Sequence, residues 1–114
     1  MENTNTNLHA DCIRICLECH QICTATVAHV LHNGGNHSET KHLIALLDCA
    51  QFCALSADFM SRLSPHHHHI SKECAEICNA CADMCEAHED PDGQMKKCAE
   101  ACRRCAESCA LMSS

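Results

Sequence analysis

The segment 98–112 reads CAEACRRCAESCALM, and cysteines recur along it at positions 98, 102, 105 and 109. Steps of four, three and four residues place side chains on one face of an α-helix, in the spacing by which helices pack around a common axis. Alanine, glutamate and arginine, which favour helices, make up most of the rest. The segment therefore predicts a helix whose buried stripe consists of thiols where leucine would be expected.

The same spacing, C-x₃-C-x₂-C-x₃-C, recurs elsewhere in the chain. Its three copies are Cys12, Cys16, Cys19 and Cys23; Cys74, Cys78, Cys81 and Cys85; and Cys98, Cys102, Cys105 and Cys109. A further segment carries a shortened copy, Cys49 and Cys53, continued at the same spacing by Ser56 and Met60. Matching runs on separate helices indicate that four helices present thiols to one interior.

Turn-forming residues divide the chain at residues 33–36 (NGGN), 64–65 (SP) and 89–93 (EDPDG). The expected helices span roughly 8–32, 37–63, 66–88 and 92–112. Because the connections are short, the sequence predicts an all-α fold, an antiparallel up-down-up-down four-helix bundle with a cysteine-lined core. The helix starts carry capping residues, which we expect to be Asn36 with Glu39, Ser64, and either Asp90 or Asp92.

Length and composition limit the possible classes of protein. A chain of 114 residues predicts one domain over 1–114, with a polar tail at about 1–7. A net charge of −7 with eight scattered basic residues disfavours nucleic-acid binding. No run approaches the ~20 consecutive apolar residues of a membrane span, and the start lacks the pattern of an export signal. We expect a cytoplasmic protein that binds neither nucleic acid nor membrane.

Fourteen cysteines, eleven histidines and five methionines dominate the chemistry of the chain. A disulfide scaffold is disfavoured, because such scaffolds are exported and rich in loops. Buried cysteine can also serve as a small hydrophobic residue. Leucine would bury more apolar area at each of these positions, however, so packing alone does not explain fourteen thiols. Reduced thiols at this density indicate metal binding.

Thiolates are soft ligands that select Cu(I), Zn(II) or iron–sulfur clusters. Zinc prefers closed four-ligand sites, and a continuous stripe offers no boundary between such sites. Cu(I) accepts two or three thiolates, and bridging thiolates let adjacent ions share ligands. An iron–sulfur cluster would need one C-x₃-C-x₂-C motif on a loop, not three in phase with helices. The pattern favours multiple Cu(I) ions.

The three full motifs, together with DCAQFCALSADFM at residues 48–60, resemble the four-helix-bundle copper storage proteins, specifically their cytosolic branch. The resemblance covers almost the whole chain. It implies thiols that bind many Cu(I) ions inside the bundle, a homo-oligomer (a tetramer in that family) and a role in holding copper safely. The second helix departs from the richer members because it carries only Cys49 and Cys53, so its capacity need not match theirs.

Weaker soft ligands fall at both ends of the expected bundle. Those near one end are His9, Met60, His67 and Met112, and those near the other are His42, His88 and Met95. Thioether and imidazole groups suit the passage of an ion inward, although a terminal methionine also fills gaps. The run of histidines at 66–69 is either a scavenging patch or a solvated first turn. We expect other histidines to face solvent, namely His20, His29, His32 and His37.

Counting the rise along each helix predicts which thiols share a height. The expected sets begin at one end with Cys12, Met60 and Cys109, and continue with Cys16, Ser56, Cys74 and Cys105, then Cys19, Cys53 and Cys102, then Cys23, Cys49, Cys78, Cys81 and Cys98. Some apolar residues lie off the thiol stripe, so apolar surface points away from the bundle axis and we expect self-association. These residues are Leu17, Ile44, Leu47 and Leu55.

The repeated thiols include no unique Cys–His pair of the kind that nucleophilic catalysis needs, so an enzyme is not expected. Two other functions use the same cysteines. One is a thiol redox buffer or sensor, and the other is a protein that sequesters zinc or cadmium. For copper storage we expect on the order of ten Cu(I) per chain, with bridging thiolates, and a metal-free form that is already folded.

Overall fold

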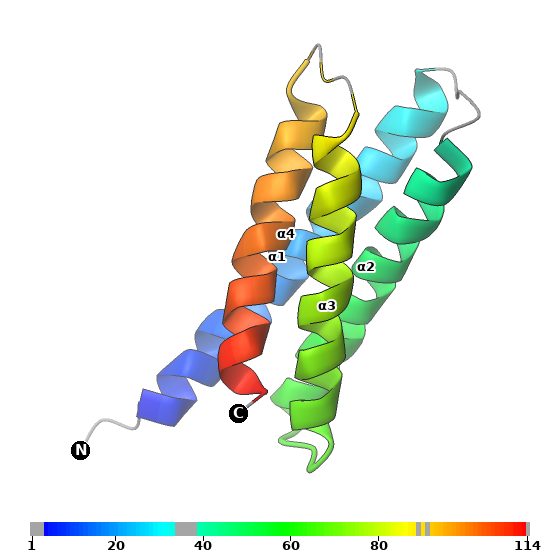
Figure 1. Ribbon diagram of the computed structural model, residues 1–114. Coiled ribbons are helices and arrows are strands. Elements are labelled where there is room, and N and C mark those ends of the chain that lie inside the picture. Colours follow the sequence, from blue (N-terminus) through cyan, green and yellow to red (C-terminus); the bar gives the residue numbers. More distant parts are fainter. Residues whose placement is uncertain (1–3, 34–38, 89, 91, 114) are drawn as a thin grey trace.

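The computed structural model describes residues 4–33, 39–88, 90 and 92–113. These residues form four helices, α1 (Thr4–His32), α2 (Glu39–Ser61), α3 (His67–Glu86) and α4 (Gln94–Met112). The helices run alternately up and down in a bundle of 51 × 22 × 19 Å (Figure 1). α1 packs against α2 and α4, and α3 completes the ring by packing against the same two helices. The predicted four-helix bundle is confirmed.

The cysteine stripes point inward on every helix. All fourteen cysteine side chains are at most 1% exposed. Larger apolar side chains lie beside them and are half-buried, among them Ile13, Ile22, Leu43 and Phe52. On α4 that place belongs to alanines such as Ala99 and Ala106. The core therefore has thiols at its axis and aliphatic groups around them, as the spacing predicts.

The observed helix ends differ from the expected ones by a few residues. α1 begins at Thr4, four residues before the expected helix start near residue 8. Asparagine and threonine are weak helix formers, but extending an existing helix adds one hydrogen bond for each residue fixed. The other three helices are shorter than expected, and α3 ends at Glu86 rather than near 88.

Ser64 caps the turn that leads into α3. Its Oγ accepts a hydrogen bond from the backbone N–H of His66 at 3.1 Å. His66 itself is the N-cap residue of α3, so the prediction of Ser64 at that position was wrong. Pro65 and His66 form a turn, so the helix itself begins at His67. The cap expected at Asn36 lies outside the described residues.

Gly93, and neither Asp90 nor Asp92, holds the N-cap position of α4, but both aspartates bond to the first N–H groups of the helix. The Asp90 carboxylate accepts hydrogen bonds from the N–H groups of Met95 at 2.8 Å and Lys96 at 2.9 Å. Asp92 Oδ1 accepts one from Gln94 N–H at 3.2 Å. Gly93, between them, has φ +82°, a left-handed conformation that favours glycine. The two carboxylates satisfy helix-terminal donors that would otherwise have no partner.

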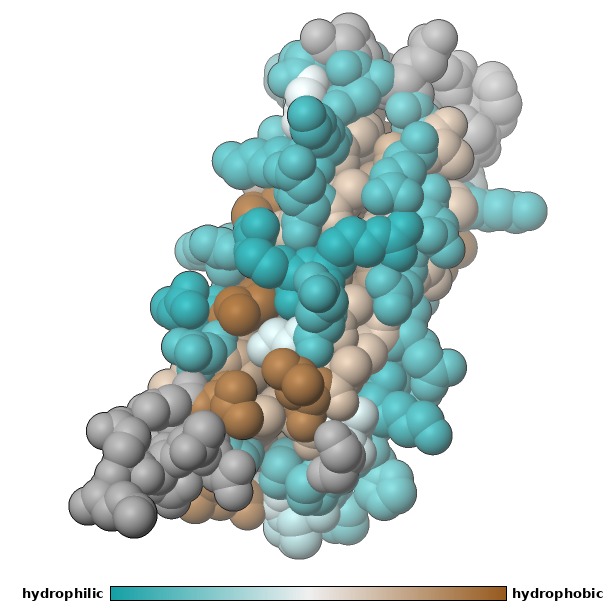
Figure 2. All heavy atoms as spheres, turned by 60° about the vertical axis from the view of Figure 1, so that its left-hand side comes forward, coloured by the Kyte–Doolittle hydropathy of each residue, from teal (hydrophilic) through white to brown (hydrophobic). Residues whose placement is uncertain are grey.

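Apolar side chains also reach the surface. On the face shown in Figure 2, hydrophilic side chains cover most of the surface, and a few hydrophobic ones gather in its lower half. Ile44, Leu47 and Leu55 of α2 are 55%, 45% and 38% exposed. By length and hydropathy alone, Thr40–Ser61 would suffice to cross a membrane, a property shared by core helices of bundles. Here the cysteine face of α2 packs into the bundle.

Leu46 and Leu47 give a direct test of this orientation. Leu46 is fully buried among the thiols, whereas Leu47 is 45% exposed. Leu46→Ala should lower the free energy of unfolding of the reduced, metal-free protein by about 2–5 kcal/mol, because it leaves a cavity. Leu47→Ala should change it by less than about 0.5 kcal/mol. Urea unfolding followed by circular dichroism measures both, and equal losses would contradict the assigned faces.

Candidate metal centre

The thiols of α1 and α4 face one another along most of the bundle. Their facing pairs are Cys12 and Cys109 (3.9 Å between sulfurs), Cys16 and Cys105 (3.7 Å), Cys19 and Cys102 (3.9 Å), and Cys23 and Cys98 (3.8 Å). The helices are antiparallel and keep a constant register, so each step of three or four residues on one meets the same step on the other. We call this array the α1/α4 ladder.

The inward residues of α2 and α3 form a second array, the α2/α3 ladder. Cys49 and Cys78 have sulfurs 3.6 Å apart, and those of Cys53 and Cys74 are 3.9 Å apart. His42 Nε2 lies 3.4 Å from Cys85 Sγ. These contacts fix one antiparallel register. Extended to the other inward positions, that register pairs Leu46 with Cys81, Ser56 with Ser71, and Met60 with His67.

Sulfur contacts join the two ladders across the axis. Cys49 Sγ lies 4.0 Å from Cys19 Sγ and 3.8 Å from Cys102 Sγ. Cys53 Sγ lies 3.7 Å from Cys105 Sγ. Cys53 was expected at the height of both Cys19 and Cys102. Its sulfur does lie within 4.8 Å of that of Cys19, but the α2 sulfur that contacts both is that of Cys49. The expectation was wrong by one step of α2, because heights were counted from helix ends that differ from the observed ones.

The prediction for Cys78 needs the same correction. It was expected at the height of Cys23 and Cys98, but it lies beside Cys49 and Cys53, 3.6 Å from each sulfur. Cys81 is the α3 thiol that joins Cys23 and Cys98. We use the word level for the inward residues of all four helices at one height along the bundle. Two central levels then hold four thiols each.

Sets of four sulfurs lie within 4.8 Å of one another at four places among the described residues. The sets are Cys16, Cys74, Cys105 and Cys109; Cys19, Cys53, Cys78 and Cys105; Cys19, Cys23, Cys49 and Cys102; and Cys23, Cys81, Cys98 and Cys102. Each set shares a thiol with the next, namely Cys105, then Cys19, then both Cys23 and Cys102. The thiols form overlapping ligand sets, not separate four-ligand sites.

The spacing of the sulfurs suits a bridged metal array. Neighbouring sulfurs lie between 3.6 and 4.0 Å apart, and every cysteine is free. For metal–sulfur bonds of about 2.3 Å, as in zinc thiolates, sulfurs are about 4.0 Å apart in a trigonal site and about 3.8 Å in a tetrahedral one. The sulfur spacing within one four-sulfur set fits either geometry. The sharing of thiols between sets favours Cu(I), because a Cu(I) ion needs fewer thiolate ligands than a Zn(II) ion.

Hydrogen bonds link the thiols into one proton-sharing array. Hydrogen bonding with Cys102 and then with Cys105 lowers the pKa of Cys19. The pKa of Cys105 is raised, first by its bond to Cys109 and then by its bond to Cys16. Burial raises both, since it disfavours a charged thiolate. Protons are thus held jointly and titrate as a set, and Cu(I), which binds thiolate, must displace them.

Imidazole and thioether groups gather at the end of the bundle where α1 begins. The rings of His9 and His67 are edge to face, with centroids 5.0 Å apart. Met60 and Met112 are buried at this end. Burial, and then the neighbouring His68 and His9 rings, lower the pKa of His67. A neutral His67 keeps a lone pair for a metal ion, and the structure brings the four predicted end residues into one region.

A second group lies at the opposite end. His42 and His88 stack with ring centroids 4.2 Å apart. His88 Nδ1–H donates to the Met84 carbonyl at 2.7 Å, which fixes the tautomer that leaves a lone pair on Nε2. His88 Nε2 is buried with no hydrogen-bond partner among the described residues. His42 and His88 lie at the end predicted from the sequence, and the structure adds the contact of His42 with Cys85.

The sequence motif does not identify the inward positions that carry no thiol. Leu46, Ser71 and Thr26 are fully buried, and each continues a cysteine stripe at the helical spacing. Ser71 comes three residues before Cys74, and Thr26 three after Cys23. The spacing that defines the motif would have identified all three if it had been continued beyond the cysteines.

Only some of the histidines that were expected to face solvent are exposed. His32 is exposed, as predicted. His20 is half-buried and its Nδ1 lies 2.7 Å from the Ala50 carbonyl, so that prediction was wrong. His29 is also half-buried and lies 3.1 Å from the Asp92 carboxylate. His37 lies outside the described residues. In the run at 66–69, His68 bonds to the Met112 carbonyl at 3.0 Å.

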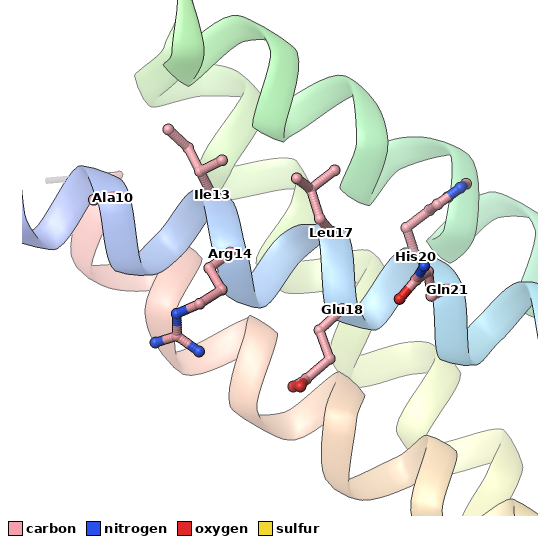
Figure 3. A pocket seen from close by; sticks show the side chains of 7 residues that line it. All are labelled: Ala10, Ile13, Arg14, Leu17, Glu18, His20 and Gln21. Carbon is pink, nitrogen blue, oxygen red and sulfur yellow. The ribbon is translucent and has the colours of Figure 1, made fainter.

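A hollow on the outer face of α1 is separate from the thiols. Figure 3 shows Ile13 and Leu17 pointing toward α2, and Arg14 and Glu18 toward α4. Glu18 pairs with Arg104 at 3.0 Å. The residues that line the hollow are Ala10, Ile13, Arg14, Leu17, Glu18, His20 and Gln21, and no cysteine is among them. It lacks the ligands of a soft-metal site.

Fold and interior together define a class of protein, a helical bundle whose core is a continuous array of soft metal ligands. The model of the copper storage protein family matches residues 5–114, and the chain belongs to that family. The Bacillus subtilis relative described as an uncharacterized cysteine-rich protein, YhjQ, is 33% identical over 78 residues, which are 68% of this chain and 72% of that protein.

Solved structures show the same fold. The Cu(I)-bound copper storage protein BsCsp3 matches with a TM-score of 0.87 and 31% identity, over 94% of this chain and 99% of that one. A cytosolic copper storage protein from Streptomyces lividans, solved with five coppers, matches with a TM-score of 0.83 and 32% identity, over 94% and 92% of the two chains. That protein has also been solved loaded with 10 copper equivalents.

Burial of the thiols predicts their reactivity. In the reduced, metal-free protein, a disulfide reagent such as Ellman's should react slowly, because each thiol is reached only when the bundle opens. In denaturant it should count fourteen thiols. Leu31→Cys, at a position that is 61% exposed, should add one fast thiol as a control. Rapid reaction of several native thiols would show that the stripes do not face inward.

Proposed function

We propose that the protein binds and stores multiple Cu(I) ions through the cysteine thiolates inside its bundle, and so serves copper storage and detoxification. The observation that carries this proposal is the overlap of the four thiol sets, because shared ligands suit a store of many ions. Copper here is cargo. Solved relatives that hold several coppers within the same fold support the proposal.

We assign all fourteen cysteines as the copper ligands. We add His9, Met60, His67, His88 and Met112 as weaker ligands at the two ends, where ions enter or leave. Support comes from the His9–His67 contact at one end and from the free, buried Nε2 of His88 at the other. Imidazole binds Cu(I) less strongly than thiolate does, so these groups suit transfer.

Two other functions use the same thiols, a redox buffer or sensor and a zinc or cadmium store. Sulfurs 3.6 to 4.0 Å apart are close enough to approach one another for oxidation, and a four-sulfur set also fits tetrahedral zinc. We favour copper because ligand sharing and family membership point to it together. We propose no catalytic activity, in keeping with a family of storage proteins.

We further propose that residues 1–114 act as one domain in the cytoplasm, binding neither nucleic acid nor membrane. The Streptomyces lividans relative is described as cytosolic. The protein has a net charge of −7 and offers no basic stripe for nucleic acid. A homo-oligomer, a tetramer by family resemblance, would cover the apolar outer face of α2, where Ile44 and Leu47 are about half exposed.

An anaerobic titration tests the storage proposal. Cu(I) added to the reduced protein against a strong chelator should bind on the order of ten ions per chain, since each thiolate can bridge. Free thiols should disappear in step, while far-ultraviolet circular dichroism changes little because the bundle is already folded. Zinc or cadmium should not displace the copper. Saturation at one or two ions, or a chain that folds only with metal, would refute storage in this form.

Charge on the outer face of α2 tests self-association. Ile44→Glu with Leu47→Glu should shift the sedimentation of the protein toward the monomer, because each buried carboxylate would lack a partner in the interface. Leu63→Glu is the matched control, in a turn and 72% exposed. A wild-type protein that sediments as a monomer at high concentration would contradict the homo-oligomer.

A further inference from the structure

Two facing serines interrupt the α2/α3 ladder. Ser56 and Ser71 occupy inward positions of α2 and α3, and neither side chain is exposed to solvent. The register set by the Cys49–Cys78 and Cys53–Cys74 contacts places them opposite each other. The core therefore contains one level, which we call the hydroxyl level, where a thiol on each of these two helices is replaced by an alcohol.

Neither hydroxyl has a hydrogen-bond partner among the described residues, although both are buried. Serine and threonine inside helices commonly bond to the carbonyl four residues earlier. Thr26 does so, donating to the Ile22 carbonyl at 2.7 Å. Ser56 and Ser71 make no such bond. Burying a polar group without a partner is costly, so these two hydroxyls call for an explanation beyond packing.

The hydroxyl level lies beside thiols of the other ladder. α2 and α4 run in the same direction, and Cys53 lies 3.7 Å from Cys105 across the axis. About one turn further along each helix come Ser56 and Cys109. Cys109 lies 3.9 Å from Cys12 and 3.6 Å from Cys16. Thiols therefore lie at or next to the height of the two serines, but neither hydroxyl is hydrogen-bonded to a sulfur among the described residues. A neutral thiol is a weak acceptor.

We propose that Ser56 and Ser71 donate hydrogen bonds to copper-bound thiolates, and that they acquire these partners only when the core is loaded. This inference rests on the proposed storage function. Whenever fewer Cu(I) ions than thiolates are bound, the core carries net negative charge, which is costly in a buried place. Donors that face thiolate offset that charge, and a bond to an ionised acceptor is about twice as strong as a neutral one.

Ser56→Ala with Ser71→Ala tests the proposal, because it removes both hydroxyls and leaves every thiol in place. The double variant should bind as many Cu(I) ions as the wild type, but part of them about tenfold more weakly against the chelator. Its sulfur-to-copper absorption should extend to longer wavelength, since thiolate electrons are less stabilised without the donors. Its metal-free form should be at least as stable, because the lost hydroxyls had no partner.

Thr26→Val is the matched control. The Thr26 hydroxyl is buried, but it already donates to Ile22 and accepts from Gln94 Nε2 at 2.9 Å. This variant should lose stability without copper and keep the wild-type copper affinity and spectrum.

Two results for the double alanine variant would overturn the proposal, namely unchanged copper affinity and spectrum, or a metal-free form less stable than the wild type. In either case copper storage would stand. A wild-type protein that takes up only one or two ions would instead end the storage proposal, and this inference with it.

Discussion

The whole interior depends on one constraint, that antiparallel helices carrying cysteine at the same four-three-four spacing must meet in a constant register. Once Cys12 faces Cys109, the next three pairs of the α1/α4 ladder follow, and each has sulfurs less than 4 Å apart. Small side chains permit this. Alanines such as Ala99 and Ala106 lie beside the thiols, so α4 approaches its neighbours closely. Leucine at the same positions would hold the helices further apart.

A thiol core resolves two opposing demands. Without metal, the neutral thiol is a small hydrophobic group that is cheap to bury, and the burial of Leu46 stabilises the fold by about 1.5–3 kcal/mol. With metal, the same sulfur is a thiolate whose charge Cu(I) largely neutralises. The bundle can therefore fold empty and fill later. The turn bond of Ser64 and the helix-terminal bonds of Asp90 and Asp92 do not involve the thiols, so they are compatible with both states.

The sequence predicted what depends on spacing and missed what depends on the offset between helices. The stripes, the number of helices and their antiparallel order follow from periodicity and turn residues. The height of α2 along the bundle does not follow from them, because counting residues along each helix leaves out how far the connecting turn shifts the next helix along the axis. Cys53 was therefore expected at the height of Cys102, where Cys49 lies. Ser71 and Thr26 were missed for another reason, since the spacing was extended beyond the cysteines only on the second helix and not before Cys74 or after Cys23.

The correct offset also shows where copper capacity is concentrated. Two central levels hold four thiols each, and the level of Cys23, Cys98 and Cys81 holds three, with Leu46 as the fourth residue. Toward the start of α1, the hydroxyl level leaves only Cys12 and Cys109 as thiols, and toward the other end His42 faces Cys85. Ligand strength thus falls from the centre to both ends. Under the proposed storage function, such a gradient would draw ions inward from imidazole and thioether to thiolate and hold them where most sulfurs can share them.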